Sequence, residues 1–323
     1  MHNRSDTSAY NEDEKQYIFH FGPHKTGTTS FQHLLNKNEE NFSKNKIEVL
    51  SVRSKNSSSY KEWRKGYAKI LHSHLLNKTN KKTTQKRLED QLLLLKSIAP
   101  KDTKTIIISD ENLLGPPPGH FIAKRTKKIT SFYGAAPLVF KAINSAFHDS
   151  KITALLVERN LTELVCSLYR DFIYKLQEPL TLEEFICTLD KKLIIQHDNF
   201  YNQAKIAFDE KLRTLDFDLF TKNADTLLHE LSKTKVQLSE VKQKNQSLTW
   251  NAIESAIKII PTISSKQEKI EAQKALLKIK KTKENSQAPN KEKIRQLLED
   301  RASQNGLTKK FFHFIQKIKR SES

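Results

Sequence analysis

The chain has 323 residues and a formal net charge of +19 at pH 7, from 56 Lys and Arg against 37 Asp and Glu. Its length allows a sizeable core, and no apolar run approaches membrane-spanning length, so we expect no transmembrane segment. The lysines are spread along the whole sequence without an aromatic-studded basic module. This distribution argues against a nucleic-acid partner and favours a solvated surface that helps to attract an anionic ligand.

The first residues and the cysteines predict the cellular location of the protein. Residues 1–16 are polar and charged, so we expect a disordered leader rather than a signal peptide. The two cysteines, Cys166 and Cys187, lie in apolar segments without metal-ligand spacing. We therefore expect buried, reduced thiols, no metal site and a cytoplasmic location.

Residues 17–35 contain the first predicted elements. Residues 17–21 form an apolar and aromatic run that predicts a buried strand, and residues 28–35 have the apolar spacing of an amphipathic helix. Between them, residues 22–27 read Gly-Pro-His-Lys-Thr-Gly. A strand, a glycine loop and a helix in this order gather backbone N–H groups and the positive end of a helix dipole around one point. The segment therefore predicts a phosphate-binding loop.

This loop differs from the nucleotide-binding loop G-x-x-x-x-G-K-[ST] in where it carries its lysine. Gly22 and Gly27 have the required separation, but Thr28 occupies the lysine position and Thr29 the hydroxyl position. The lysine lies within the loop, as Lys25. A kinase needs its lysine on the transferred phosphate, whereas this arrangement suits a 5′-phosphate that bears a different group to be transferred. A glycine turn that binds no ligand is the alternative.

Residues 22–32 resemble the 5′-phosphosulfate-binding loop of sulfotransferases, the enzymes that use 3′-phosphoadenosine 5′-phosphosulfate (PAPS), and are most similar to the bacterial branch of that family. The resemblance implies that Lys25 neutralises charge on the phosphosulfate bridge as that bridge breaks. It also implies a set of cofactor-binding residues that spans the loop: Gly22, Pro23, His24, Lys25, Thr26, Gly27, Thr28 and Thr29.

Two carboxylates follow the next buried strand. The sequence predicts a short strand near 47–51, helices at 60–77 and 83–98, and a β-branched strand at 104–109. Asp110 and Glu111 come directly after it, where open α/β sheets bind their ligands. Asp110 as the cap of a short turn is the alternative. A strand ending in Ser-x-Glu occurs here in bacterial sulfotransferases, so the resemblance implies that Glu111 is the base, with His24 as the second candidate.

A second anion-binding motif follows the clearest strand of the chain, residues 151–157. Asn160 and Glu163 predict a capping box and a helix that begins at about residue 161, with Arg159 at the end of the strand. Ser167 lies two helical turns past the cap, on the same side, so Arg159 and Ser167 can converge on one dianion. The pair also resembles the 3′-phosphate motif of sulfotransferases, in a Ser-x-Tyr-Arg context.

The rest of the chain is mostly helical. A Pro/Gly/Lys-rich segment at 116–136 predicts a functional loop. We expect helices at 137–147, 182–189, 198–208 and 224–231, a last strand at 212–217, and lysine-rich helices at 250–260, 266–281, 291–302 and 308–319. The final helix either docks on the domain or contacts a membrane surface. The Arg-Lys-Gly segment of animal sulfotransferases has no counterpart in this sequence, so some of the residues that would bind the nucleotide stay unassigned.

Together these features predict an α/β protein. Residues 17–250 are expected to form a P-loop-like three-layer domain, a short parallel sheet flanked by helices, and residues 251–323 a helical C-terminal extension. The resemblance implies in-line transfer of a sulfuryl group from PAPS to a hydroxyl or amine, leaving adenosine 3′,5′-bisphosphate. The expected acceptor is a carbohydrate, either a glycan or a glycolipid. A P-loop nucleotide or sugar kinase and a non-catalytic anion-binding protein are the alternatives.

Overall fold

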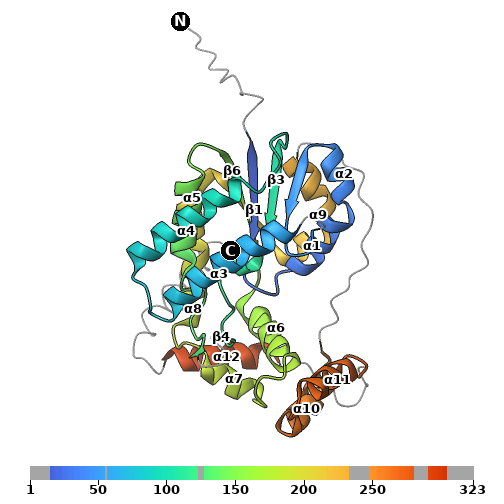
Figure 1. Ribbon diagram of the computed structural model, residues 1–323. Coiled ribbons are helices and arrows are strands. Elements are labelled where there is room, and N and C mark those ends of the chain that lie inside the picture. The colour runs from blue at the N-terminus through green and yellow to red at the C-terminus, as the bar shows by residue number, and fades with distance from the viewer. Residues whose placement is uncertain (1–14, 55–56, 123–126, 233–247, 280–289, 304–323) are drawn as a thin grey trace, which may run out of the picture.

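A five-stranded parallel sheet is the centre of the molecule (Figure 1). The structure is a computed structural model and describes residues 15–54, 57–122, 127–232, 248–279 and 290–303. The strand order is β2-β3-β1-β6-β7. The five strands are β1 (Gln16–Phe21), β2 (Ile47–Leu50), β3 (Thr105–Ser109), β6 (Lys151–Glu158) and β7 (Leu212–Asp216). All five lie within a residue or so of the predicted positions. The α/β fold class expected from the sequence is therefore confirmed.

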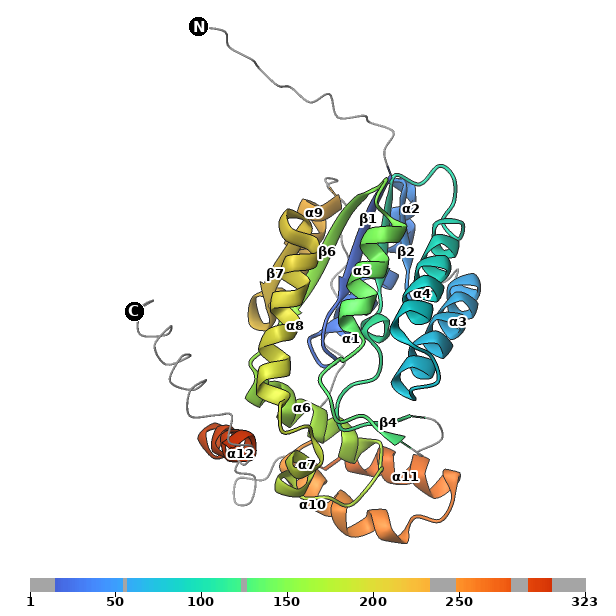
Figure 2. The ribbon, with the colours of Figure 1, turned by 90° about the vertical axis from the view of Figure 1, so that its left-hand side faces the viewer.

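Helices cover both faces of the sheet because each central strand buries side chains on both sides. In β1, Tyr17, Phe19 and Phe21 belong to one hydrophobic cluster and Ile18 to the other. The second cluster is closed by α1 (Thr28–Lys37), α2 (Glu39–Lys44) and α9 (Phe217–Ser232). The first is closed by α3 (Ser57–Leu75), α4 (Lys81–Lys96), α5 (Ala136–Ala146) and α8 (Leu193–Phe208), which lie together on one side of the sheet in Figure 2. The result is the predicted three-layer arrangement.

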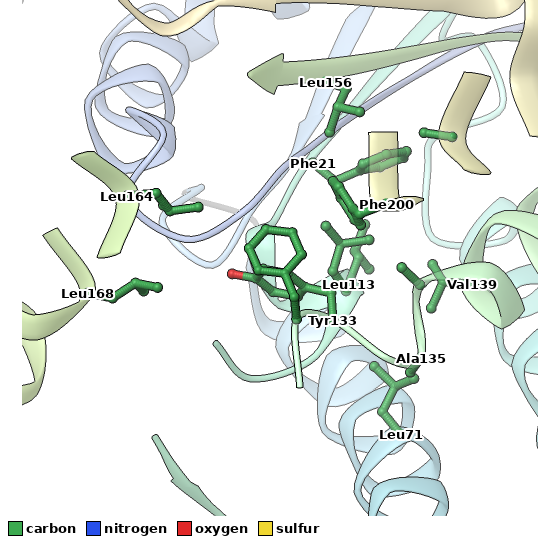
Figure 3. Close-up of a cluster of buried hydrophobic side chains, with 14 of the residues drawn as sticks. Phe21, Leu71, Leu113, Tyr133, Ala135, Val139, Leu156, Leu164, Leu168 and Phe200 are labelled. Atoms are coloured by element: carbon green, nitrogen blue, oxygen red, sulfur yellow. The ribbon is translucent and has the colours of Figure 1, made fainter. Parts of the chain in front are cut away.

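The core on the α5 side continues past the ends of the strands. Figure 3 shows Phe21 and Leu156, from the ends of β1 and β6, beside Val139 and Phe200 of α5 and α8. Tyr133 lies in the same cluster, and its hydroxyl oxygen points away from Val139. The apolar packing therefore reaches the edge of the sheet at which β1 and β6 end.

Several elements differ from the expectations. The helix α2 was not predicted, α8 begins five residues before the expected position, and α9 begins directly after β7. The expected loop at 116–136 contains a small antiparallel pair, β4 (Phe121–Ile122) with β5 (Lys127–Lys128). The described residues also contain three 3₁₀ turns: η1 (Glu111–Leu114), η2 (Asp209–Lys211) and η3 (Ile260–Thr262). The helix α2, the β4–β5 pair and the 3₁₀ turns are short elements whose apolar period is too brief to predict them.

The described C-terminal helices pack on the main core. The helices α10 (Trp250–Ile259) and α12 (Lys291–Ser303) contact α6 (Leu161–Tyr174), and α12 also contacts α7 (Leu182–Thr188). The remaining helix, α11 (Lys266–Leu276), contacts α10, and Leu276 is buried in the same cluster. The expected leader is described only from residue 15, and the helix expected at 308–319 lies outside the described residues. None of the described helices has the length and apolar composition needed to cross a bilayer.

The cysteines are free, but their burial differs from the expectation. Cys166 is half-buried on α6, and Cys187 is exposed on α7. The apolar neighbours of Cys187 misled the prediction, since Phe185 and Ile186 take the buried positions of that short helix.

Candidate functional site

The glycine loop and Arg159 meet at the point where the sheet changes direction. After β1 the chain crosses to β2 and β3 on one side, and then returns to β6 on the other side of β1. Because β1 and β6 are parallel neighbours, with Phe21 paired to Leu156, the segments that follow them emerge side by side at one edge. Open α/β sheets bind ligands at such a switch point.

The backbone of the glycine loop leaves the start of α1 without a side-chain cap. Lys25 has a φ of 71° and Gly27 a φ of 82°, and Gly27 is the N-cap of α1, so no side chain caps the first N–H groups of that helix. Thr26 closes the loop on itself, because its Oγ1 donates to the carbonyl oxygen of Pro23 at 2.7 Å. Thr28 is 3 % exposed, and its hydroxyl has no partner among the described residues. These N–H and hydroxyl groups are the kind that bind a phosphate at a helix N-terminus.

Lys25 is held by an acidic residue that the sequence reading missed. Its Nζ lies 2.5 Å from Oδ1 of Asp171, on α6. The same carboxylate contacts Nζ of Lys175 at 2.6 Å and Nε2 of His120 at 3.0 Å. Burial by itself would raise the pKa of Asp171, but the His120 hydrogen bond and the charges of Lys25 and Lys175 outweigh it and hold this pKa far below its ordinary value. One signal was available: Asp171 is four residues after Ser167, on the same face of the helix.

The two carboxylates after β3 have separate surroundings. Asp110 caps the turn η1, since its Oδ1 accepts from the backbone N–H of Asn112 at 2.9 Å, as the alternative reading held. Its Oδ2 accepts from Nε of Arg64 at 2.5 Å and from the hydroxyl of Tyr60 at 3.2 Å. Asp110 is 1 % exposed, so this buried carboxylate is fully engaged in holding the turn.

Glu111 has few partners by comparison. Its Oε2 accepts from Nε2 of Gln32 at 3.3 Å, and that amide also donates to the carbonyl oxygen of Ser109 at 2.9 Å. Burial, and next the charge of Asp110, raise the pKa of Glu111 above its ordinary value. A carboxylate whose pKa is raised is a stronger proton acceptor than an ordinary glutamate.

His24 is the other candidate base. The hydroxyl of Tyr133 accepts from the backbone N–H of His24 at 2.6 Å and lies 2.8 Å from its Nδ1. The two rings are stacked, 5.9 Å apart at their centroids. Burial, and then the charges of His120 and Lys175, lower the pKa of His24 to about 3. His24 is therefore neutral in the resting protein and a weak proton acceptor.

Arg159 is in contact with the glycine loop. Its Nη1 donates to the carbonyl oxygen of Lys25, and its Cζ lies 4.3 Å from the centroid of the Phe217 ring. The Nε of Arg159 is buried and has no partner in the described part of the chain. The helix α6 begins at Leu161 as predicted, with the Asn160 side chain accepting from the backbone N–H of residue 162. The predicted capping box does not form, because Asn160 caps residue 162 rather than Glu163, and the Glu163 carboxylate pairs with Lys291.

Ser167 lies on the half-buried side of α6. The buried side of that helix carries Leu164, Val165 and Leu168, whereas Ser167, Arg170 and Asp171 are only partly covered. The structure thus brings the loop, Glu111 and Arg159 to one edge of the sheet. In the described residues, no group of three or more His, Cys, Asp or Glu side chains is arranged to hold a metal ion.

Comparison with known proteins adds a structural likeness. No family model and no curated protein matches the sequence. Among solved structures, the crystal structure of a sulfotransferase from Alicyclobacillus acidocaldarius superimposes on 82 % of this chain and 96 % of that chain. The two share 12 % sequence identity, and the TM-score is 0.42. Because both values are low, the argument from structure to function depends on the site itself.

Proposed function

We propose that the protein is a sulfotransferase that moves a sulfuryl group from PAPS to a hydroxyl or amine of an acceptor. The observation that carries the proposal is the contact of Arg159 with the carbonyl oxygen of Lys25. It joins a phosphate-type loop at the end of β1 to a guanidinium at the end of β6. Two adjacent anion-binding groups suit a nucleotide with phosphates on both sides of its ribose.

The residues at this edge fit such a nucleotide. The N–H groups that open α1 and the hydroxyls of Thr28 and Thr29 would hold the 5′-phosphate, and Arg159 and Ser167 the 3′-phosphate. In two of these residues, Thr28 and Arg159, a buried hydrogen-bond donor has no partner among the described residues. A bound phosphate would provide the missing acceptor for each donor. PAPS supplies the sulfuryl group, and the bound product is adenosine 3′,5′-bisphosphate.

The remaining residues have distinct roles in the proposed reaction. Glu111 is the base that takes the proton from the hydroxyl or amine of the acceptor substrate. Its pKa is raised, which makes it the better proton acceptor, whereas the pKa of His24 is lowered to about 3. Gln32 orients the Glu111 carboxylate through the hydrogen bond at 3.3 Å. Lys25 moves from Asp171 to the bridging oxygen, where negative charge develops. The proposed acceptor class, a glycan or glycolipid, follows the resemblance of the motifs.

Ligand-dependent thermal stabilisation tests the proposal. A ligand that binds only the folded state raises the melting temperature according to its affinity. Adenosine 3′,5′-bisphosphate should raise it far more than AMP, ADP or ATP, and magnesium should make no difference. Arg159→Ala should remove this preference and leave binding of AMP by the loop. The exposed Arg213 on β7, changed to Ala, is the matched control.

Two other results of this measurement would contradict the proposal. A magnesium-dependent preference for ATP over the bisphosphate would replace the sulfotransferase with a P-loop kinase. Equal, weak stabilisation by every polyanion tested would instead indicate a non-catalytic anion-binding protein.

A further inference from the structure

We propose that Arg170 is an additional ligand of the 3′-phosphate and that Trp250, from the C-terminal helix α10, holds it in position. The inference rests on the proposed function and extends the site to α10, a helix that follows the last strand of the sheet in the chain. Figure 1 shows α10 beside α6, the helix that carries Ser167 and Arg170.

The helix α6 places Arg170 next to the proposed phosphate position. Ser167 and Arg170 are three residues apart and therefore share a face of the helix. Asp171, four residues after Ser167, contacts Lys25 in the glycine loop. Ser167 thus lies between a residue that faces the loop and a residue that faces α10. A phosphate on the Ser167 hydroxyl would have Arg170 on its far side from the loop.

Trp250 supports the Arg170 side chain. The Cζ of Arg170 lies 4.7 Å from the centroid of the Trp250 ring. The Trp250 ring is itself stacked on Tyr169, which is 2 % exposed, with the ring centroids 6.2 Å apart. A guanidinium that lies over an indole ring uses its face for this contact, and its N–H groups along the edge stay available for an anion.

Unpaired buried donors gather around this position. The Nε atoms of Arg170 and Arg159 and the Nε1 of Trp250 are buried, and none has a hydrogen-bond partner in the described part of the chain. An unpaired buried donor costs free energy, so three of them from neighbouring elements are unexpected in a site that binds nothing. A phosphate dianion supplies acceptors to such donors.

The local charge also favours an anion. Burial raises the pKa of the Cys166 thiol, and the charges of Arg170 and Arg159 both act against that rise, so both guanidinium groups lie near this part of α6. The nearby Glu163 carboxylate is paired with Lys291 of α12. No carboxylate among the described residues pairs with Arg170. Two like charges held close repel each other, and a dianion between them would relieve that repulsion.

Isothermal titration with two nucleotides tests the inference. Arg170→Gln should weaken the binding of adenosine 3′,5′-bisphosphate at least about tenfold, the usual effect of losing one charge-assisted hydrogen bond. Binding of AMP, which lacks the 3′-phosphate, should not change. Arg87→Gln, an equal change of charge at an exposed position of α4, is the control and should bind both ligands as the wild type does.

The role of Trp250 is tested by the preference for the bisphosphate over AMP, a ratio that a purely structural role would not change. Trp250→Leu removes the ring and should reduce the preference for the bisphosphate over AMP, whereas Trp250→Phe should keep most of it. Equal weakening of both nucleotides in Trp250→Leu would show a general effect on folding and would contradict a positioning role. If Arg170→Gln is poorly folded, Arg170→Lys keeps the charge without the planar fork and should show a partial loss.

The possible failures are distinguishable. A wild-type protein that does not prefer the bisphosphate over AMP overturns the proposed function and this inference together. A wild-type preference that survives in Arg170→Gln overturns the role of Arg170 and leaves the proposed function in place.

Discussion

The Nζ of Lys25 lies 2.5 Å from Oδ1 of Asp171, a residue 146 positions further along the chain. This ion pair joins the glycine loop to α6 and determines where the loop lysine points before any ligand binds. The carboxylate is also shared with Lys175 and His120. In the proposed reaction Lys25 must exchange this carboxylate for the phosphosulfate bridge.

Lys25→Ala should reduce kcat by about 100-fold or more, the effect of losing one donor to a developing negative charge. Binding of adenosine 3′,5′-bisphosphate should change much less, because the N–H groups of the loop and Arg159 remain. Single-turnover kinetics with PAPS and a separate binding titration would measure the two effects. A variant with the wild-type rate would remove Lys25 from the mechanism.

Asp171→Asn should tighten the binding of the bisphosphate several-fold, because it removes a negative charge beside the anion and releases Lys25. It should also lower the melting temperature of the free protein, since Lys25, Lys175 and His120 lose their shared partner. Asp149→Asn, which breaks the exposed pair of Asp149 with Lys96, is the matched control. Weaker binding in Asp171→Asn would mean that Asp171 holds Lys25 in its productive place.

Glu111→Gln should lose activity while binding the bisphosphate normally, because an amide cannot accept the proton of the acceptor. A general base must be deprotonated, and burial raises the pKa of Glu111. The acid limb of kcat/KM in the wild type should therefore lie above the ordinary pKa of a glutamate. If Glu111→Gln is active and His24→Ala is inactive, the base is His24 instead.

His20 should make the protein unstable in acid. It is 0 % exposed and packs against the rings of Phe31 and Phe220, and burial lowers its pKa to about 3. The unfolded chain, with an ordinary histidine pKa near 6.5, binds this proton first. The resulting stability is thus fully present above pH 6.5 and is lost as the pH falls toward 3, at about 1.4 kcal/mol per pH unit.

Urea unfolding between pH 7 and pH 4 would measure this dependence. His20→Leu should show a shallower loss of unfolding free energy with falling pH than the wild type. His148→Leu, a change on an exposed loop, should keep the wild-type slope. An unchanged slope in His20→Leu would show that other groups control acid stability.

The sequence by itself determined the elements whose signals are local. The strand β3 follows from a run of β-branched residues, and the start of α6 from the cap at Asn160. The glycine loop follows from the spacing of Gly22 and Gly27. Each of these signals lies within about ten residues and depends on backbone preference and apolar period, which act over that range.

Only the tertiary structure decided which side chains meet. Asp171 against Lys25, Tyr133 against His24, and Trp250 against Arg170 each join segments far apart in the chain. Such pairs depend on which helix packs beside which strand end, and no local period encodes that choice. The pKa values of Glu111 and His24 were unreadable from sequence for the same reason, because burial by distant segments is the largest cause of both shifts.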